Sequence, residues 1–227
     1  MGSGIMPSAG HDADESWFWL IAGINGAGKS TLVNNLRSRR ILNANYYNPD
    51  SITQWILEHK NLGRLVSKLP LCSKHGLNLA NKHAANLAMD IVNITLEKTD
   101  GSLAIETVLS TDKYRECVEL AKKSGRKIGL VYVGLKSADQ AIERVKARVE
   151  GGGHDVPEKK IRERWVRSLA QLPWFVEQAD LALIYSNAND KPGQLANGPE
   201  QLAIKTGGKL EWQNKTALPH VAAALGA

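Results

Sequence analysis

The sequence predicts an α/β fold built on a mainly parallel sheet of five strands. Short apolar runs alternate with longer amphipathic stretches, the pattern of parallel strands joined by crossover helices. A glycine-rich turn directly follows the first apolar run, and turn residues near the C-terminus indicate a hairpin across Gly207-Gly208. We therefore expect three layers, helix–sheet–helix, followed by a C-terminal hairpin and a short helix.

Five apolar runs are the expected parallel strands: 17–23, 44–50, 102–110, 127–135 and 179–187. The segments between them have helical spacing of their apolar residues. The expected helices are 29–38, 75–98, 111–124, 137–149 and 157–178. Pro157 fits the first position of the last of these, where the missing N–H costs nothing. The hairpin is expected over 200–214 and the short helix over 216–225.

Length and composition restrict the class of protein. With 227 residues, 43% of them hydrophobic, the chain suits one domain with a real core. We expect 1–15 to be a disordered tail and 16–227 a single domain, with a helical insertion at about 52–98. No apolar run is long enough to span a bilayer, no cleavable signal is visible, and two cysteines are too few for a disulfide framework. These features predict a cytoplasmic protein without a membrane partner.

The net charge of +6 has two interpretations. A basic chain can bind nucleic acid. Phosphate-bearing substrates also require cations, however, and the 29 basic residues are spread along the chain. We therefore favour a small phosphate compound over nucleic acid as the partner.

The turn AGINGAGKST, residues 22–31, carries the most informative motif. Gly23, followed after four residues by Gly28-Lys29-Ser30, has the spacing of a phosphate-binding loop (P-loop) between a strand and a helix. Backbone N–H groups of such a turn bind phosphate, a lysine reaches the β- and γ-phosphates, and a serine hydroxyl binds Mg²⁺. We expect Lys29 to be exposed in the loop and Ser30 to be the metal ligand. The expected ATP-binding residues are Gly23, Asn25, Gly26, Ala27, Gly28, Lys29, Ser30 and Thr31.

Two acidic residues lie at or near the ends of expected strands, Asp50 in YYNPD and Glu106 in LAIET. The carboxyl ends of parallel strands line one crevice with the phosphate loop. A carboxylate there can take the proton of an acceptor hydroxyl, as kinases require. Asp50 could instead cap a helix that begins at residue 51; we favour the base. Glu106 would be costly to bury without a partner.

Arginines cluster on two expected helices separated by GGGHDVP. Arg144 and Arg148 share one helix face, and three glycines follow them. Arginine fits phosphate with a planar fork and neutralises charge during transfer. We expect a lid over about 148–168 that hinges at the glycines, although these charges could also be solvated partners of nearby glutamates. The arginines of the second helix are Arg162, Arg164 and Arg167.

The stretches GINGAGKST, NPDSI, AIETVLS, RVKARVEGGGHDVPEKKIRERWVRSLAQL and YSN occur in this order. Together they resemble the zeta toxin family of P-loop kinases over about residues 17–190. The similarity is to the chromosomal single-domain branch with the GGHDVP signature. The resemblance implies a P-loop NTPase-type fold and ATP- and Mg²⁺-dependent transfer of phosphate to the 3′-hydroxyl of the amino sugar in UDP-N-acetylglucosamine. It also implies a possible antitoxin protein as partner.

The same resemblance implies roles for individual residues. Asp50 matches the catalytic base, and Glu106 and Thr107 match the pair that faces the acceptor sugar. In the turn, His154 is nearest to the position where plasmid toxins carry an arginine. The implied catalytic residues are Asp50, Lys29, Arg148, Arg164 and Arg167, and the implied acceptor-binding residues are Asp50, Glu106, Thr107, Ser110 and His154.

Two other functions remain open at this point. One is a kinase of nucleotide or polynucleotide hydroxyls. The other is a nucleotide-dependent switch or binding module with negligible phosphoryl transfer.

Overall fold

The computed structural model describes residues 15–38, 42–48, 51, 86, 89–90, 92–97, 101–153, 155–188 and 198–227. The expected tail at 1–15 and the expected insertion at about 52–98 therefore lie largely outside the described residues. Among the helices of the described part, none is both long and apolar enough to cross a bilayer.

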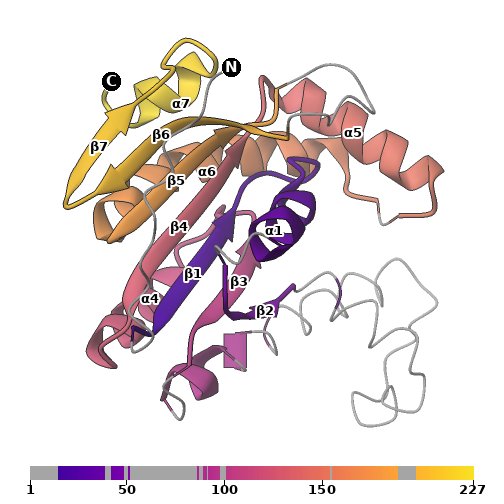
Figure 1. The fold of residues 1–227 in the computed structure, drawn as a ribbon. Coiled ribbons are helices and arrows are strands. Elements are labelled where there is room, and N and C mark those ends of the chain that lie inside the picture. Colours follow the sequence, from indigo (N-terminus) through magenta and orange to yellow (C-terminus); the bar gives the residue numbers. More distant parts are fainter. Residues whose placement is uncertain are drawn as a thin grey trace, which may run out of the picture.

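A seven-stranded sheet forms the centre of the structure (Figure 1). Its order is β2-β3-β1-β4-β5-β6-β7. The strands are β1 (Trp17–Ala22), β2 (Asn45–Tyr47), β3 (Leu103–Thr107), β4 (Lys127–Gly134), β5 (Leu181–Ser186), β6 (Glu200–Thr206) and β7 (Lys209–Trp212). The first five strands in this order are parallel, whereas β6 and β7 are antiparallel.

The five parallel strands confirm the expected fold class, but the hairpin is not a separate appendage. It pairs with β5 through β6 and extends the same sheet. An unpaired edge of β5 would leave its N–H and C=O groups open, and the hairpin covers them.

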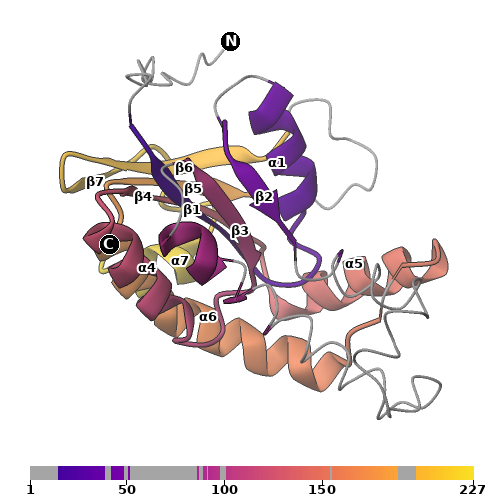
Figure 2. The ribbon, with the colours of Figure 1, turned by 90° about the horizontal axis from the view of Figure 1, so that it is seen from below.

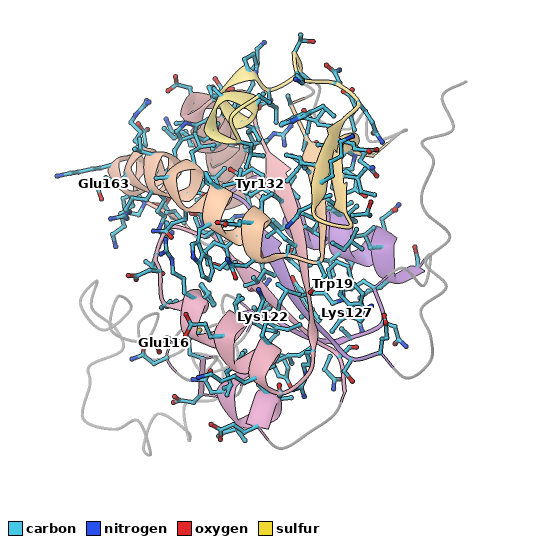
Figure 3. The ribbon with its side chains drawn as sticks, turned by 90° about the vertical axis from the view of Figure 1, so that its left-hand side faces the viewer. Trp19, Glu116, Lys122, Lys127, Tyr132 and Glu163 are labelled. Carbon is cyan, nitrogen blue, oxygen red and sulfur yellow. The ribbon has the colours of Figure 1, made fainter. Side chains whose placement is uncertain are left out.

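Helices cover both faces of the sheet, as expected for three layers. They are α1 (Lys29–Ser38), α4 (Tyr114–Lys123), α5 (Ala138–Glu150), α6 (Glu158–Gln178) and α7 (Pro219–Ala224). Buried residues of α4, α7 and the C-terminal half of α6 belong to one core, and those of α1, α5 and Ile161 near the start of α6 belong to the other. Figure 2 shows α4 and α6 on one side of the sheet and α1 on the opposite side. In Figure 3, Trp19 and Tyr132 lie inside the molecule, whereas Glu163 of α6 is at its surface.

The strand order brings the candidate segments to one edge of the sheet. β1 lies between β3 and β4, and the last residue of β1, Ala22, pairs with Thr107 and with Tyr132. The turn that starts at Gly23 is therefore level with the carboxyl end of β3. This is the edge at which open α/β sheets bind ligands.

A buried lysine of the hairpin binds the C-terminal end of α6. Lys205 of β6 is 7% exposed, and its Nζ donates to the carbonyl oxygens of Val176 at 2.8 Å, Glu177 at 2.7 Å and Ala179 at 2.7 Å. The last carbonyl groups of a helix have no partner within the helix. Lys205 supplies that partner and so joins the hairpin to the long helix.

We expect Lys205→Met to lower the free energy of unfolding by about 2–4 kcal/mol, because several buried carbonyl groups lose a charged donor. Lys209→Met on β7 is the matched control, since its side chain is 80% exposed. Its effect should stay within about 0.5 kcal/mol. Denaturant unfolding of both variants measures the difference, and equal effects would show that Lys205 does not stabilise the end of α6.

Candidate active site

The phosphate loop has the backbone shape that its motif requires. The turn connects β1 to α1, with φ angles of 78° at Gly26 and 86° at Gly28. Residues with a side chain rarely adopt such angles. A Cβ at Gly26 would lie 2.9 Å from the carbonyl oxygen of Ala141, so the loop also packs closely against α5. The strand–turn–helix context expected for this motif is present.

Asn187, directly after β5, holds the loop from the other side. Its Nδ2 donates to the carbonyl oxygen of Ala27 at 2.9 Å, and a Cβ at Gly28 would lie 2.5 Å from the same nitrogen. Gln140 of α5 donates to the carbonyl oxygen of Ala188 at 3.0 Å and so fixes the segment after β5. The sequence analysis gave Asn187 no role. Its position as a polar residue at the carboxyl end of a parallel strand was the available signal.

Lys29 is buried rather than exposed, so the expectation of an exposed lysine is wrong. It is 7% exposed, and its Nζ donates to the carbonyl oxygens of Gly23 at 2.9 Å and Ile24 at 3.3 Å. The same nitrogen lies 3.5 Å from Oε1 of Glu106. The loop carbonyls and this carboxylate give the ammonium group partners inside the fold, which explains its burial.

Glu106 of β3 is the centre of a polar cluster. It is 8% exposed, and its Oε2 accepts hydrogen bonds from the Ser30 hydroxyl at 3.2 Å, from Asn48 Nδ2 at 2.9 Å and from the Tyr46 hydroxyl. Burial, followed by the charge of Glu106, raises the pKa of Tyr46 well above its usual range. The phenol therefore remains a hydrogen-bond donor. Sequence reasoning found Glu106 but missed Tyr46 and Asn48, although their spacing of two places them on one side of an extended segment.

The turn after β3 is tightly shaped. The hydroxyl oxygen of Thr107 accepts a hydrogen bond from the backbone N–H of Leu109 at 2.9 Å. Leu109 is buried with a φ of 58°, an uncommon angle for a residue with a side chain. Thr107 is thus buried and engaged within the turn, while Ser110 beyond it is half-buried.

The candidate arginines differ in their contacts. Arg164 of α6 is half-buried, and its Nη1 donates to Oδ1 of Asn25 in the phosphate loop at 3.0 Å. Arg162 instead pairs with Asp139 of α5 at 2.6 Å, and both side chains are exposed. Arg148 and Arg167 are exposed. The structure thus joins Arg164 to the loop and directs Arg162 to another partner.

The glycine segment between α5 and α6 forms a bonded turn. The N–H groups of Gly151, Gly152 and Gly153 donate to carbonyl oxygens of the last turn of α5. A Cβ at Gly153 would lie 2.6 Å from Cγ of Arg148, so this corner is closely packed. Asp50 and His154 lie outside the described residues.

Oxygen ligands suited to a divalent cation meet beside the loop. Magnesium in phosphate-binding sites is held by one or two carboxylates together with substrate phosphates. The Ser30 hydroxyl and the Glu106 carboxylate supply oxygens from two sides. Within the described ranges, no cluster of three or more His, Cys, Asp or Glu residues could hold a metal ion by itself. A Mg²⁺ ion here would need the phosphates of a nucleotide as further ligands.

The parallel sheet order, the loop after β1, the buried Lys29 and the exposed Ser30 beside it define a P-loop fold. No protein-family model matches the chain. A Haemophilus influenzae protein described as uncharacterized is 26% identical over 143 residues, which make up 63% of this chain and 88% of that protein.

Solved structures share the fold. A chain of the AvrRxo1-ORF1:AvrRxo1-ORF2 complex matches with a TM-score of 0.66 and 16% identity, over 94% of this chain and 65% of that chain. The complex with ATP matches with the same TM-score of 0.66, at 15% identity and the same coverage of 94% and 65%. A chain of the PezAT toxin–antitoxin system of Streptococcus pneumoniae gives 0.58 and 17%, over 77% of this chain and 70% of that chain.

These matches confirm the fold part of the resemblance. The chain has a P-loop NTPase-type α/β/α fold, which it shares with the chains of the AvrRxo1 complex and of the PezAT system. It spans 65% of the length of the AvrRxo1 complex chain. The assignment to the branch with the GGHDVP signature remains a prediction.

We expect Gly28→Ala to weaken ATP binding by about tenfold or more, because the added methyl group displaces Asn187 and misaligns N–H groups that bind phosphate. Gly125→Ala is the matched control: its φ of 78° is similarly left-handed, but nothing lies within 4 Å of the new Cβ. It should lose stability and keep ATP affinity. Calorimetric titration with ATP measures the affinity of both variants. An equal loss of affinity in both would show that Gly28 has no specific part in ATP binding.

Proposed function

We propose that this protein is an ATP- and Mg²⁺-dependent kinase that transfers the γ-phosphate to a hydroxyl group of a small molecule. The observation that carries the proposal is that Lys29 and Ser30 both meet the carboxylate of Glu106, at 3.5 Å and 3.2 Å, at the carboxyl end of β1 and β3. The similar fold of the AvrRxo1 complex with ATP supports the choice of nucleotide.

Each residue near the loop has a distinct task in this proposal. The backbone N–H groups of residues 23–31 bind the phosphates, and Lys29 turns from the loop carbonyls to the β- and γ-phosphates. Bound Mg²⁺ would neutralise phosphate charge, with Ser30 as a ligand. Arg164 supports the loop through Asn25, and its guanidinium group would bind the γ-phosphate. Arg148 and Arg167 complete a lid over about 148–168.

The acceptor side of the proposal is a sugar hydroxyl, with the 3′-hydroxyl of UDP-N-acetylglucosamine favoured by the family resemblance. Asp50 is the general base. The engagement of Glu106 by donors from Ser30, Tyr46 and Asn48 supports this division of labour, because a base needs an oxygen directed at the acceptor. Thr107, Ser110 and His154 would bind the acceptor, and Glu106 would border the acceptor site while its own partners hold its carboxylate.

The proposal also covers the domain, location and partner of the protein. Residues 16–227 would form a single domain that acts in the cytoplasm, and an antitoxin protein is a candidate partner. The PezAT structure, which belongs to a toxin–antitoxin system, supports the idea of such a partner.

Incubation with ATP, Mg²⁺ and a panel of nucleotide sugars, sugars and nucleosides tests the reaction. Mass spectrometry should detect the gain of one phosphate on UDP-N-acetylglucosamine, and Lys29→Ala should give none. Phosphate gained by another compound instead would support the kinase activity and show that the acceptor assignment is wrong. Tight ATP binding without any phosphorylated product from a broad panel, including oligonucleotides, would favour a nucleotide-dependent switch.

Asp50→Asn should reduce phosphate transfer by roughly 10²–10⁴-fold while ATP affinity is unchanged, because the amide keeps the shape and capping ability of the side chain but cannot accept the proton. Single-turnover rates and ATP titrations of the variant provide the measurement. Overproduction of the wild-type protein should slow growth, and the variant should be harmless. Transfer at the wild-type rate would leave Asp50 as a helix cap only.

The arginine lid predicts a local response to nucleotide. A non-hydrolysable ATP analogue with Mg²⁺ should slow amide hydrogen exchange in 151–168, because guanidinium contacts with phosphate order the start of α6. Mass spectrometry of peptides from this segment measures the exchange, with α7 (Pro219–Ala224) as the internal reference. Unchanged exchange in 151–168 would exclude this segment as a lid.

A further inference from the structure

The carboxylate of Glu106 is held from three separate parts of the chain. The Ser30 hydroxyl comes from the start of α1, Tyr46 from β2, and Asn48 from the segment after β2. All three donate to the same oxygen, Oε2, while the other oxygen, Oε1, faces Lys29 at 3.5 Å. Figure 2 shows β2 beside β3, and Tyr46 pairs with Ala104, two residues before Glu106.

The partners of Glu106 differ in how easily their side chains can move away from the carboxylate. The ammonium group of Lys29 ends a flexible stem and already shares its donors with two loop carbonyls. Tyr46 belongs to a strand that is paired with β3. If the phosphates of a nucleotide attract Lys29, the carboxylate loses the cation to which it is paired in the described part of the chain. A buried carboxylate without a cation is costly, so a second cation in place of Lys29 would stabilise Glu106.

A suitable position for that cation lies beside Ser30. The Ser30 hydroxyl is the expected metal ligand and is 3.2 Å from Oε2 of Glu106. A carboxylate so close to a metal ligand can bind the ion directly or through one of its waters. Tyr46 and Asn48 are neutral donors and do not compete for the cation.

We propose that Tyr46 and Asn48 are positioning residues for Glu106, and that the carboxylate they hold exchanges Lys29 for the metal ion of the incoming nucleotide. In the resting chain, Glu106 restrains Lys29. In the loaded chain, Glu106 retains the metal. The inference rests on the proposed binding of ATP at this loop, and it is independent of the identity of the acceptor.

Because of this exchange, Glu106 should weaken ATP binding in the absence of metal and strengthen it when metal is present. Glu106→Gln is a neutral variant of the same shape, so Lys29 is no longer restrained by a carboxylate. We expect ATP affinity in EDTA to rise by about tenfold, because a charge-assisted contact that competes with phosphate is lost. The enhancement of ATP affinity by Mg²⁺ should fall by about tenfold or more, because a carboxylate no longer serves the metal.

The positioning role is tested by Tyr46→Phe, which keeps the aromatic ring and removes one donor. The enhancement by Mg²⁺ should fall about fivefold, the worth of one hydrogen bond, while ATP affinity in EDTA is unchanged. Asn48→Ala should act in the same direction. Tyr47→Phe is the matched control on the same strand, since Tyr47 packs against the hydrophobic core, and both affinities should remain at wild-type values.

Calorimetric titration with ATP in EDTA and in Mg²⁺ gives the two affinities without any turnover. Mn²⁺ in place of Mg²⁺ allows paramagnetic resonance to report the metal directly, and thermal unfolding checks that each variant is folded. Parallel losses of affinity in both buffers would indicate a purely structural role for Tyr46 and would overturn the positioning claim. An unchanged metal enhancement in Glu106→Gln would overturn the exchange.

These outcomes differ from failure of the proposed function. If the wild-type protein binds no ATP in either buffer, the nucleotide site itself is wrong. If it binds ATP and transfers phosphate while Glu106→Gln retains the full enhancement by Mg²⁺, the kinase stands and the inference alone is refuted.

Discussion

The buried negative charge of Glu106 constrains the structure around the phosphate loop. A carboxylate in the interior destabilises a fold unless cations and donors surround it. Here the cation comes from the helix after β1, and the neutral donors come from that helix and from β2 and the segment after it. β2, β3 and the turn after β1 must therefore keep fixed positions relative to one another around this carboxylate. The short β2 (Asn45–Tyr47) is held at the sheet edge by side-chain contacts as well as by its pairing with β3.

The long helix α6 connects the phosphate loop with the C-terminal hairpin. Arg164 joins its N-terminal half to Asn25 of the loop, and Lys205 of β6 binds the carbonyl groups at its C-terminal end. The helix is thus fixed at two points, one in the candidate active site and one in the hairpin. The antiparallel hairpin contributes to the site at a distance, because it determines where the helix that carries the arginines ends.

Local sequence patterns predicted most of the fold. The helix 29–38 was predicted with its observed bounds, and each parallel strand was found within a few residues, because hydrophobic periodicity and turn residues are local signals. The pairing of β6 with β5 was missed, since edge pairing depends on the neighbours that an element meets in space. The loop motif identified Lys29 and Ser30, but the burial of Lys29 depends on Glu106, a residue far along the chain. Asn48 and Asn187 lie in the stretches NPDSI and YSN, but those stretches gave them no role, and like Tyr46 they gain their roles only through the strand order.

The contacts of the arginines determine which of them can move at low cost. The pair of Arg162 and Asp139 is exposed on both sides, and exposed ion pairs contribute about 0–1 kcal/mol. Arg164 is half-buried and bonded to the loop, so its displacement is coupled to the loop itself. The glycine turn beside Arg148 is bonded to α5 through its own N–H groups, and the other end of α6 is held by Lys205. The least costly movement is therefore a release of Arg162 from Asp139 at the start of α6, while the far end of the helix remains in place.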